Sequence, residues 1–98
     1  MPLQRDPEET ETRYLHDAVR LAGRRVLEIG CGEGRLTWRY AQAAGRVVGV
    51  DLDRARLRTA QSECAPDLRP KVNFTLADSQ TLPFPDGAFE AAVLAWSL

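Results

Sequence analysis

Three glycines and two acids lie close together in the stretch VLEIGCGEGRLT, which covers residues 26–37. Gly30, Gly32 and Gly34 leave the main chain without side chains, so a ligand can approach backbone N–H and carbonyl groups directly. Glu28 precedes the glycines and Glu33 lies among them. Because carboxylates repel phosphates in a partly desolvated cleft, this loop favours a ligand with an ammonium group and hydroxyls over a pyrophosphate.

The spacing of the glycines also bears on the class of ligand. A dinucleotide-binding loop has the pattern G-x-G-x-x-G, and counting from Gly30 and Gly32 places Arg35 at its third glycine. The third glycine of this chain, Gly34, comes one residue earlier. The loop therefore differs from that of nicotinamide- and flavin-dependent oxidoreductases. Arg35 offsets part of the carboxylate charge, so this class stays open as an alternative.

The sequence around the loop alternates between apolar runs and amphipathic stretches. The pattern predicts strands over residues 24–29, 46–51, 71–78 and 89–98, and helices over 6–22, 35–44 and 53–64. Gly23 and Gly45 are interpreted as helix stops, and Asp53 as the N-cap of the third helix. Arg54, Arg56 and Arg58 are interpreted as its solvated face. Near-continuous apolar strands separated by helices are typical of a parallel sheet that is covered on both faces.

Composition limits the function classes that need considering. The 98 residues have 44% hydrophobic and 28% charged content and a net charge of -1, which indicates one globular domain without the basic excess of a nucleic-acid-binding surface. The first residues lack the basic flank and apolar stretch of a signal peptide or membrane span. Cys31 and Cys64 show neither disulfide-scaffold nor metal-site spacing, so we expect no metal and a cytoplasmic location.

Acids also follow the second and third predicted strands. Asp51 ends RVVGVD and Asp78 ends KVNFTLAD, and LPFPDGAFEAAV then leads into the fourth strand. With Glu28 and the three glycines, this order resembles the class I S-adenosylmethionine-dependent methyltransferases of the small-molecule type, although Glu90 stands where an aspartate is more usual. The resemblance spans most of residues 24–98. It implies a three-layer α/β/α Rossmann-like fold with strand order 3-2-1-4, truncated after the fourth strand, behind a lead-in helix over residues 1–23.

The same resemblance implies a role for each matching residue. Asp51 would accept hydrogen bonds from both ribose hydroxyls, Leu52 would pack on the adenine, and Asp78 would accept from the adenine amine. The backbone of the glycine loop, with Glu28, would receive the methionine moiety and its ammonium. The full set of expected cofactor contacts is Glu28, Gly30, Cys31, Gly32, Gly34, Asp51, Leu52, Ala77, Asp78, Ser79 and Ala95.

The implied activity is transfer of the methyl group of S-adenosylmethionine to a small-molecule acceptor, with S-adenosylhomocysteine as product. No catalytic base can be named from the sequence, and no nucleic-acid or membrane partner is expected. The edge of the fourth strand is apolar, with Val93, Leu94 and Trp96 nearby. We expect either that the chain is a fragment of a longer protein or that this edge pairs with a second copy of the chain. The remaining alternatives are an NAD(P)- or FAD-dependent oxidoreductase and a non-catalytic fragment that self-associates.

Overall fold

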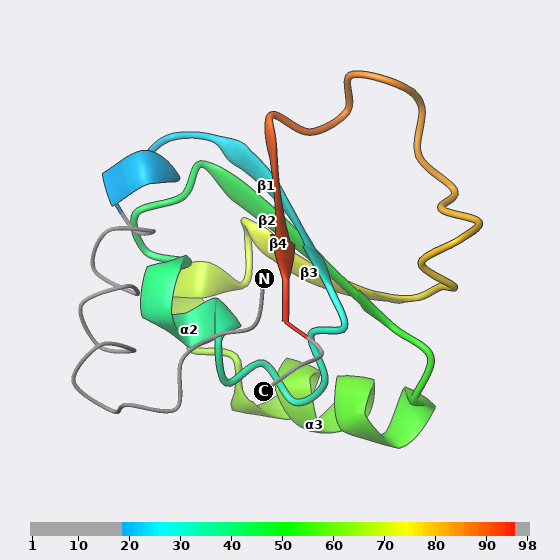
Figure 1. Cartoon of the computed structure of the whole chain (residues 1–98). Helices are drawn as coiled ribbons and strands as arrows, with labels where there is room; N and C mark the ends of the chain where they lie inside the picture. Colours follow the sequence, from blue (N-terminus) through cyan, green and yellow to red (C-terminus); the bar gives the residue numbers. More distant parts are fainter. Residues whose placement is uncertain (1–18, 96–98) are drawn as a thin grey trace, which may run out of the picture.

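A four-stranded parallel sheet forms the centre of the molecule (Figure 1). The structure is a computed structural model that describes residues 19–95. Its strands are β1 (Arg25–Ile29), β2 (Arg46–Asp51), β3 (Val72–Leu76) and β4 (Ala91–Leu94). They lie in the order β3-β2-β1-β4, and every neighbouring pair is parallel. The α/β class and the strand order expected from the sequence are confirmed.

The two central strands are the most apolar part of the chain, and this places them inside the sheet. In β1 and β2, Val26 and Val47 are opposite one another and both fully buried. Their neighbours Leu27 and Val48 point to the other face and are also buried. Burial on both faces explains why these runs show no polar alternation.

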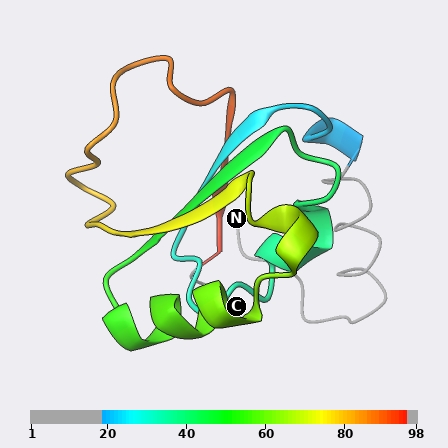
Figure 2. The same ribbon diagram turned by 180° about the vertical axis from the view of Figure 1, so that it is seen from behind.

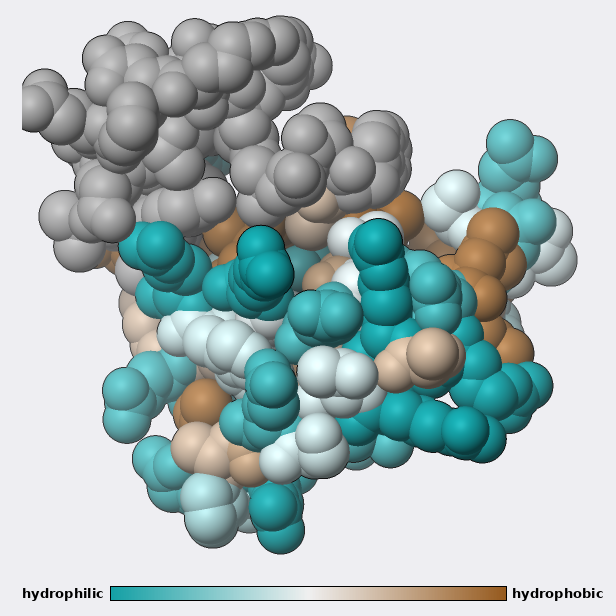
Figure 3. Space-filling view, turned by 90° about the horizontal axis from the view of Figure 1, so that it is seen from below, coloured by the Kyte–Doolittle hydropathy of each residue, from teal (hydrophilic) through white to brown (hydrophobic). Residues whose placement is uncertain are grey.

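The helices of residues 19–95 pack on the face of the sheet that carries Val26 and Val47. They are α2 (Thr37–Tyr40), α3 (Arg54–Glu63) and the 3-10 helix η1 (Pro66–Leu68). Apolar residues of α2, η1 and the adjoining segments form one core cluster with the strands: Leu21, Val26, Leu36, Tyr40, Ala41, Ala44, Val47, Cys64, Leu68, Val72 and Ala95. Helix α3 itself buries Leu57 and Ala60. The side of the molecule over α3, seen from below in Figure 3, is mainly hydrophilic.

The opposite face of the sheet is covered by the connection between β3 and β4. Leu27 and Val48 of this face belong to a second cluster, against which Leu82, Phe84 and Phe89 of the connection pack. The two phenylalanine rings meet edge to face with centroids 5.1 Å apart. The connection forms a wide arc on one side of the molecule in the two opposite views (Figures 1 and 2). The sequence motif LPFPDGAF is thus part of a core.

Two glycines interpreted as helix stops have different roles. Gly23 has a φ of 71°, the left-handed conformation expected at a helix end. Gly45 has no such φ, and the helix expected over 35–44 is shortened to α2, so its interpretation as a stop is wrong. A Cβ atom at Gly45 would lie 2.6 Å from the carbonyl oxygen of Gly23. Gly45 is therefore required by the close approach of two backbone segments.

The structure confirms one further helix prediction and leaves most of another outside the described residues. Asp53 is the N-cap of α3, because its side chain accepts a hydrogen bond from the backbone N–H of Arg56 at 3.1 Å. Most of the lead-in helix expected over residues 6–22 lies outside the described residues. Within residues 19–95, none of the helices has the length and apolar character needed to span a bilayer.

Candidate functional site

The glycine loop lies beyond the carboxyl end of β1, between β2 and β4. Gly30, Gly32 and Gly34 all have positive φ values, of 78°, 56° and 90°. Two cavities open beside the loop, one of about 340 Å³ and one of about 270 Å³. Gly30 and Asp51 line both of them. The site therefore consists of two adjoining compartments that meet at the ends of β1 and β2, where parallel α/β sheets bind ligands.

Asp51 stands at the junction of the two cavities, and backbone N–H groups hold its carboxylate in place. Its Oδ2 accepts from the N–H of Gly32 at 2.8 Å, and its Oδ1 accepts from the N–H of Asp53 at 2.9 Å. An ionised carboxylate offers about four acceptor positions. About two positions are left for a ligand, which matches the number of hydroxyls on a ribose.

Glu28 lies behind the loop and not in either cavity. Its side chain is fully buried, and its Oε1 accepts from the hydroxyls of Thr37 at 2.8 Å and Tyr40 at 2.5 Å. Its Oε2 is buried and has no hydrogen-bond partner among the described residues. Burial raises the pKa of this carboxyl to about 7, although the two hydroxyls act in the opposite direction. Glu28 therefore connects β1 to α2.

The three glycines serve different purposes. A Cβ atom at Gly34 would lie 2.8 Å from the Trp38 ring, which itself meets Phe74 edge to face. A Cβ atom at Gly32 would only reach the Arg56 side chain, at 3.7 Å. Gly34 is thus needed for packing as well as for its backbone conformation, whereas Gly32 borders the larger cavity.

Cys31 lines the larger cavity but is poorly suited to react. Its side chain is 5% exposed, and a Cβ atom at Gly49 would lie 2.8 Å from its Sγ. Burial, with further contributions from Glu28 and Asp51, raises the pKa of the thiol to about 12. The thiol is therefore protonated at neutral pH, and its small size lets the loop cross β2 closely.

The smaller cavity is the more apolar of the two. It is lined by Ile29, Gly30, Val50, Asp51, Leu52, Ala77 and Ser79. Leu52 is 69% exposed, so a wide apolar surface faces solvent beside Asp51. Asp78 is not among the lining residues: its Oδ1 accepts from the N–H of Gln80 at 2.9 Å within a turn. Of the predicted residues from this region, Leu52, Ala77 and Ser79 meet at the cavity.

The larger cavity contains one charged residue, Arg56, that the sequence interpretation did not place there. It is lined by Gly30, Cys31, Gly32, Glu33, Arg35, Leu36, Asp51, Arg56 and Ala95. Arg56 was expected on the solvated face of α3, and its side chain is indeed 62% exposed. It also lines the cavity, because Arg56 follows the N-cap Asp53 closely enough for its side chain to reach back to the end of β2. The lining holds two carboxylates and two guanidinium groups, so the charge argument against phosphate ligands is weaker than the sequence indicates.

Known proteins that this chain is similar to are methyltransferases and their structural relatives. The family model described as "Methyltransferase domain" matches residues 26–98. A demethylmenaquinone methyltransferase from Renibacterium salmoninarum is 32% identical over 87 residues, which cover 88% of this chain and 35% of that protein. A probable S-adenosylmethionine-dependent methyltransferase from Mycolicibacterium smegmatis is 36% identical over 83 residues, with 85% and 30% covered. The chain thus spans about a third of the length of these relatives.

Solved structures share the arrangement of the sheet and helices. The [4+2]-cyclase SpnF superposes with a TM-score of 0.71 at 30% identity, over 87% of this chain and 33% of that one. An S-adenosylmethionine-dependent methyltransferase from Mesorhizobium loti superposes with a TM-score of 0.70 at 24% identity, over 85% and 37%. The second likeness shows the fold alone.

Proposed function

We propose that this chain, which belongs to the methyltransferase domain family, binds S-adenosylmethionine across the two adjoining cavities and forms the cofactor-binding part of a methyltransferase. The observation that carries the proposal is the position of Asp51, with free acceptor capacity, between an apolar cavity and a polar one. S-adenosylmethionine has the same order of parts: a flat base, a ribose and a zwitterionic amino-acid end. Family membership favours this ligand over the dinucleotides of the oxidoreductases.

The shapes and charges of the cavities support the fit. The adenine would lie in the smaller cavity beside Leu52, with polar groups near Ala77 and Ser79 at its edge. The ribose would donate to Asp51. The amino-acid end would lie in the larger cavity, where Glu33 and Arg35 supply one carboxylate and one guanidinium group for a ligand with both charges. Gly30 and Gly32 would admit it against bare backbone.

Two predicted contacts need a more limited role in this proposal. Glu28 is fully buried, so it would act on the cofactor's ammonium through the loop that it supports, or through a water at its unpartnered Oε2. Asp78 would reach the adenine amine with the oxygen that is not engaged by the N–H of Gln80. Direct contact remains a prediction for both.

The chemistry follows from what the cofactor supplies when bound, which is an electrophilic methyl group on a sulfonium. The chain's own residues would hold the cofactor in one orientation, and Ala95, which is 6% exposed and lines the larger cavity, would leave room for an acceptor there. Positioning of this kind can contribute on the order of 7 to 11 kcal/mol to catalysis. We assign no general base.

A small molecule is the proposed acceptor. The relatives' names point to this class, since one is a demethylmenaquinone methyltransferase and another is an O-methyltransferase from Aspergillus nomiae. Two finer proposals rest on separate features. A cytoplasmic location is supported by Cys31 and Cys64, which are both free and buried. Self-association is supported by β4, which pairs with only one strand among residues 19–95 and whose Leu94 is 53% exposed.

Calorimetric titration of the chain with S-adenosylmethionine, S-adenosylhomocysteine and NAD tests the proposed ligand. We expect saturable binding of the first two and much weaker binding of NAD. S-adenosylhomocysteine is the safer probe because it does not carry the reactive methyl group. Preferential binding of NAD would contradict the proposal and restore the oxidoreductase alternative.

A further inference from the structure

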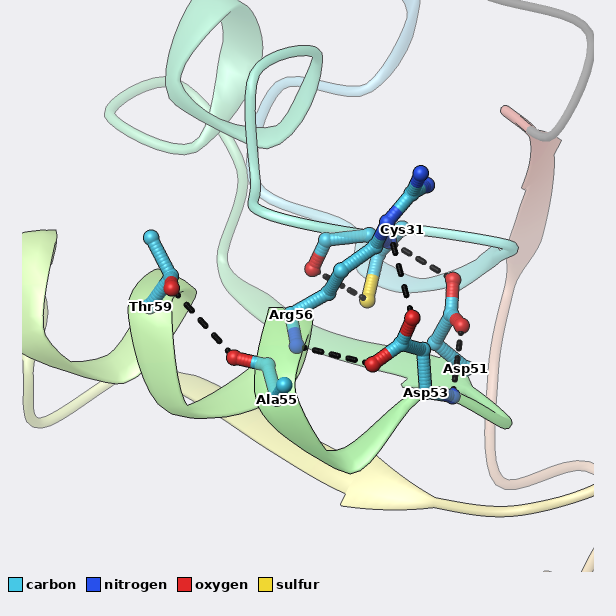
Figure 4. Close-up of polar contacts among 7 residues, drawn as sticks. Cys31, Asp51, Asp53, Ala55, Arg56 and Thr59 are labelled. Carbon is cyan, nitrogen blue, oxygen red and sulfur yellow. Dashed lines mark hydrogen bonds and ion pairs between the residues drawn. The ribbon is translucent and has the colours of Figure 1, made fainter.

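Arg56 is the one arginine of α3 that lines the larger cavity. It lies in the first turn of α3, and its Nε is 3.7 Å from Oδ2 of the N-cap Asp53. Its Nη1 is 3.7 Å from the point where Gly32 would carry a Cβ. Figure 4 shows the side chain rising from α3 toward the glycine loop, with Asp51 and Asp53 on one side of it. The guanidinium therefore lies beside Gly32, whose backbone N–H donates to the Asp51 carboxylate.

The guanidinium of Arg56 supplies hydrogen-bond donors, which the Asp51 carboxylate lacks. Asp51 is a carboxylate and can only accept hydrogen bonds, whereas a ribose hydroxyl both donates and accepts. The only polar contact of the Arg56 side chain within residues 19–95 is the one to Asp53 through Nε, so its Nη groups can donate to a ligand. A hydroxyl that donates to Asp51 would then have its lone pairs turned toward a nearby cation.

We propose that Arg56 is a second ribose-binding residue, which donates to a hydroxyl oxygen of the cofactor while Asp51 accepts from the same ribose. This inference rests on the proposed function and deepens it by naming a residue that determines how tightly the nucleoside is held. A neutral side chain at this position would leave the ribose with Asp51 as its only charged partner. The structure assigns this role to Arg56 and not to Arg54 or Arg58, which are outside the lining of the cavity.

The test compares Arg56→Met with Arg54→Met as a matched control from the same turn of α3. Arg56→Met keeps the backbone N–H that Asp53 caps, and it removes only an exposed ion pair, so the fold should be retained and is checked by circular dichroism. Affinity is measured by calorimetry for three kinds of ligand. They are S-adenosylhomocysteine, its 2′-deoxy and 3′-deoxy derivatives, and methylthioadenosine, which lacks the amino-acid end.

We expect Arg56→Met to weaken S-adenosylhomocysteine and methylthioadenosine alike, by about three- to tenfold, because the lost contact is a partly exposed charge-assisted hydrogen bond. The loss should nearly vanish for the deoxy derivative that lacks the contacted hydroxyl, and Arg54→Met should change nothing.

A loss confined to S-adenosylhomocysteine would place Arg56 on the carboxylate and overturn the ribose assignment. An equal loss for both deoxy ligands, an equal loss in Arg54→Met, or no loss would also overturn it. If the wild-type chain binds none of these ligands, the proposed function itself fails and this inference with it. Normal binding by the wild-type chain with the wrong pattern in Arg56→Met contradicts the inference alone.

Discussion

Replacing the buried Glu28 by glutamine should change how the stability of the fold depends on pH. The pKa of Glu28 is raised from 4.5 to about 7, chiefly by burial. Between these values the folded chain binds more protons than the unfolded chain, so the contribution of Glu28 is fully present below pH 4.5 and is lost as the pH rises through about 7. A shift of this size corresponds to about 3 kcal/mol in the free energy of unfolding.

Glutamine has the same shape and no charge to bury. Its amide oxygen can still accept from the hydroxyls of Thr37 and Tyr40, which both donate to Oε1 of Glu28. The amide N–H groups bring a cost of their own, but that cost is the same at every pH. The difference in unfolding free energy between Glu28→Gln and the wild type should therefore rise in favour of the variant by about 2.5 kcal/mol between pH 5 and pH 8.

Urea unfolding followed by tryptophan fluorescence measures this difference at several pH values, because Trp38, one of the two tryptophans, packs against Phe74 only in the folded state. Other titrating groups are common to both proteins and cancel. Tyr40→Phe removes one donor to Oε1, which should raise the pKa of Glu28 further. The pH at which the contribution of Glu28 is lost should then be higher in this variant than in the wild type. A difference between Glu28→Gln and wild type that stays constant from pH 5 to pH 8 would refute the reasoning.

Three further predictions concern the loop and its neighbours. Asp51→Ala should weaken S-adenosylhomocysteine binding by about 1.5 to 3 kcal/mol in calorimetry. The control is Asp67→Ala, at an exposed acid of η1 that lines neither cavity, and it should not weaken binding; equal affinities would remove Asp51 from the site. Gly49→Ala should lower the free energy of unfolding by about 1 to 3 kcal/mol in urea, because its Cβ would lie 2.8 Å from Sγ of Cys31, and full stability would contradict that packing. Cys31 should resist alkylation at pH 8 in the folded chain, because burial raises the pKa of its thiol to about 12; rapid modification seen by peptide mass spectrometry would argue against this.

The sheet could be predicted because its signals are local and strong. The run RVVGVD was expected to be a strand over residues 46–51, and β2 has those bounds. Asp53 was predicted as an N-cap from its position after a strand and before a helical pattern, and its side chain makes that bond. Such features depend on neighbours within a few residues. The chain that follows α2 contacts distant backbone instead, through a bridge between Ala22 and Ala44, which no local pattern contains.

The residues that line the larger cavity were harder to predict, because lining depends on the direction of a side chain in space. Arg54, Arg56 and Arg58 are alike in type and spacing, and their pattern predicts one solvated face. Of the three, only Arg56 lines the larger cavity. The nearby N-cap Asp53 was the one signal that could have identified this residue, because its carboxylate lies 3.7 Å from the Arg56 Nε.

The two acids of the candidate site show how one motif can hold two kinds of chemistry. Asp51 ends its strand, where no further pleat turns the side chain into the core, and it meets backbone N–H groups at the junction of the cavities. Glu28 lies one residue before the end of β1, so the pleat turns it toward α2, where Thr37 and Tyr40 supply hydroxyls. Burial makes the Glu28 carboxylate costly to ionise, although its two hydroxyl partners oppose this, whereas the Asp51 carboxylate lines both cavities. Asp51 is therefore suited to bind a polar ligand, whereas Glu28 is suited to fix the loop that carries the glycines.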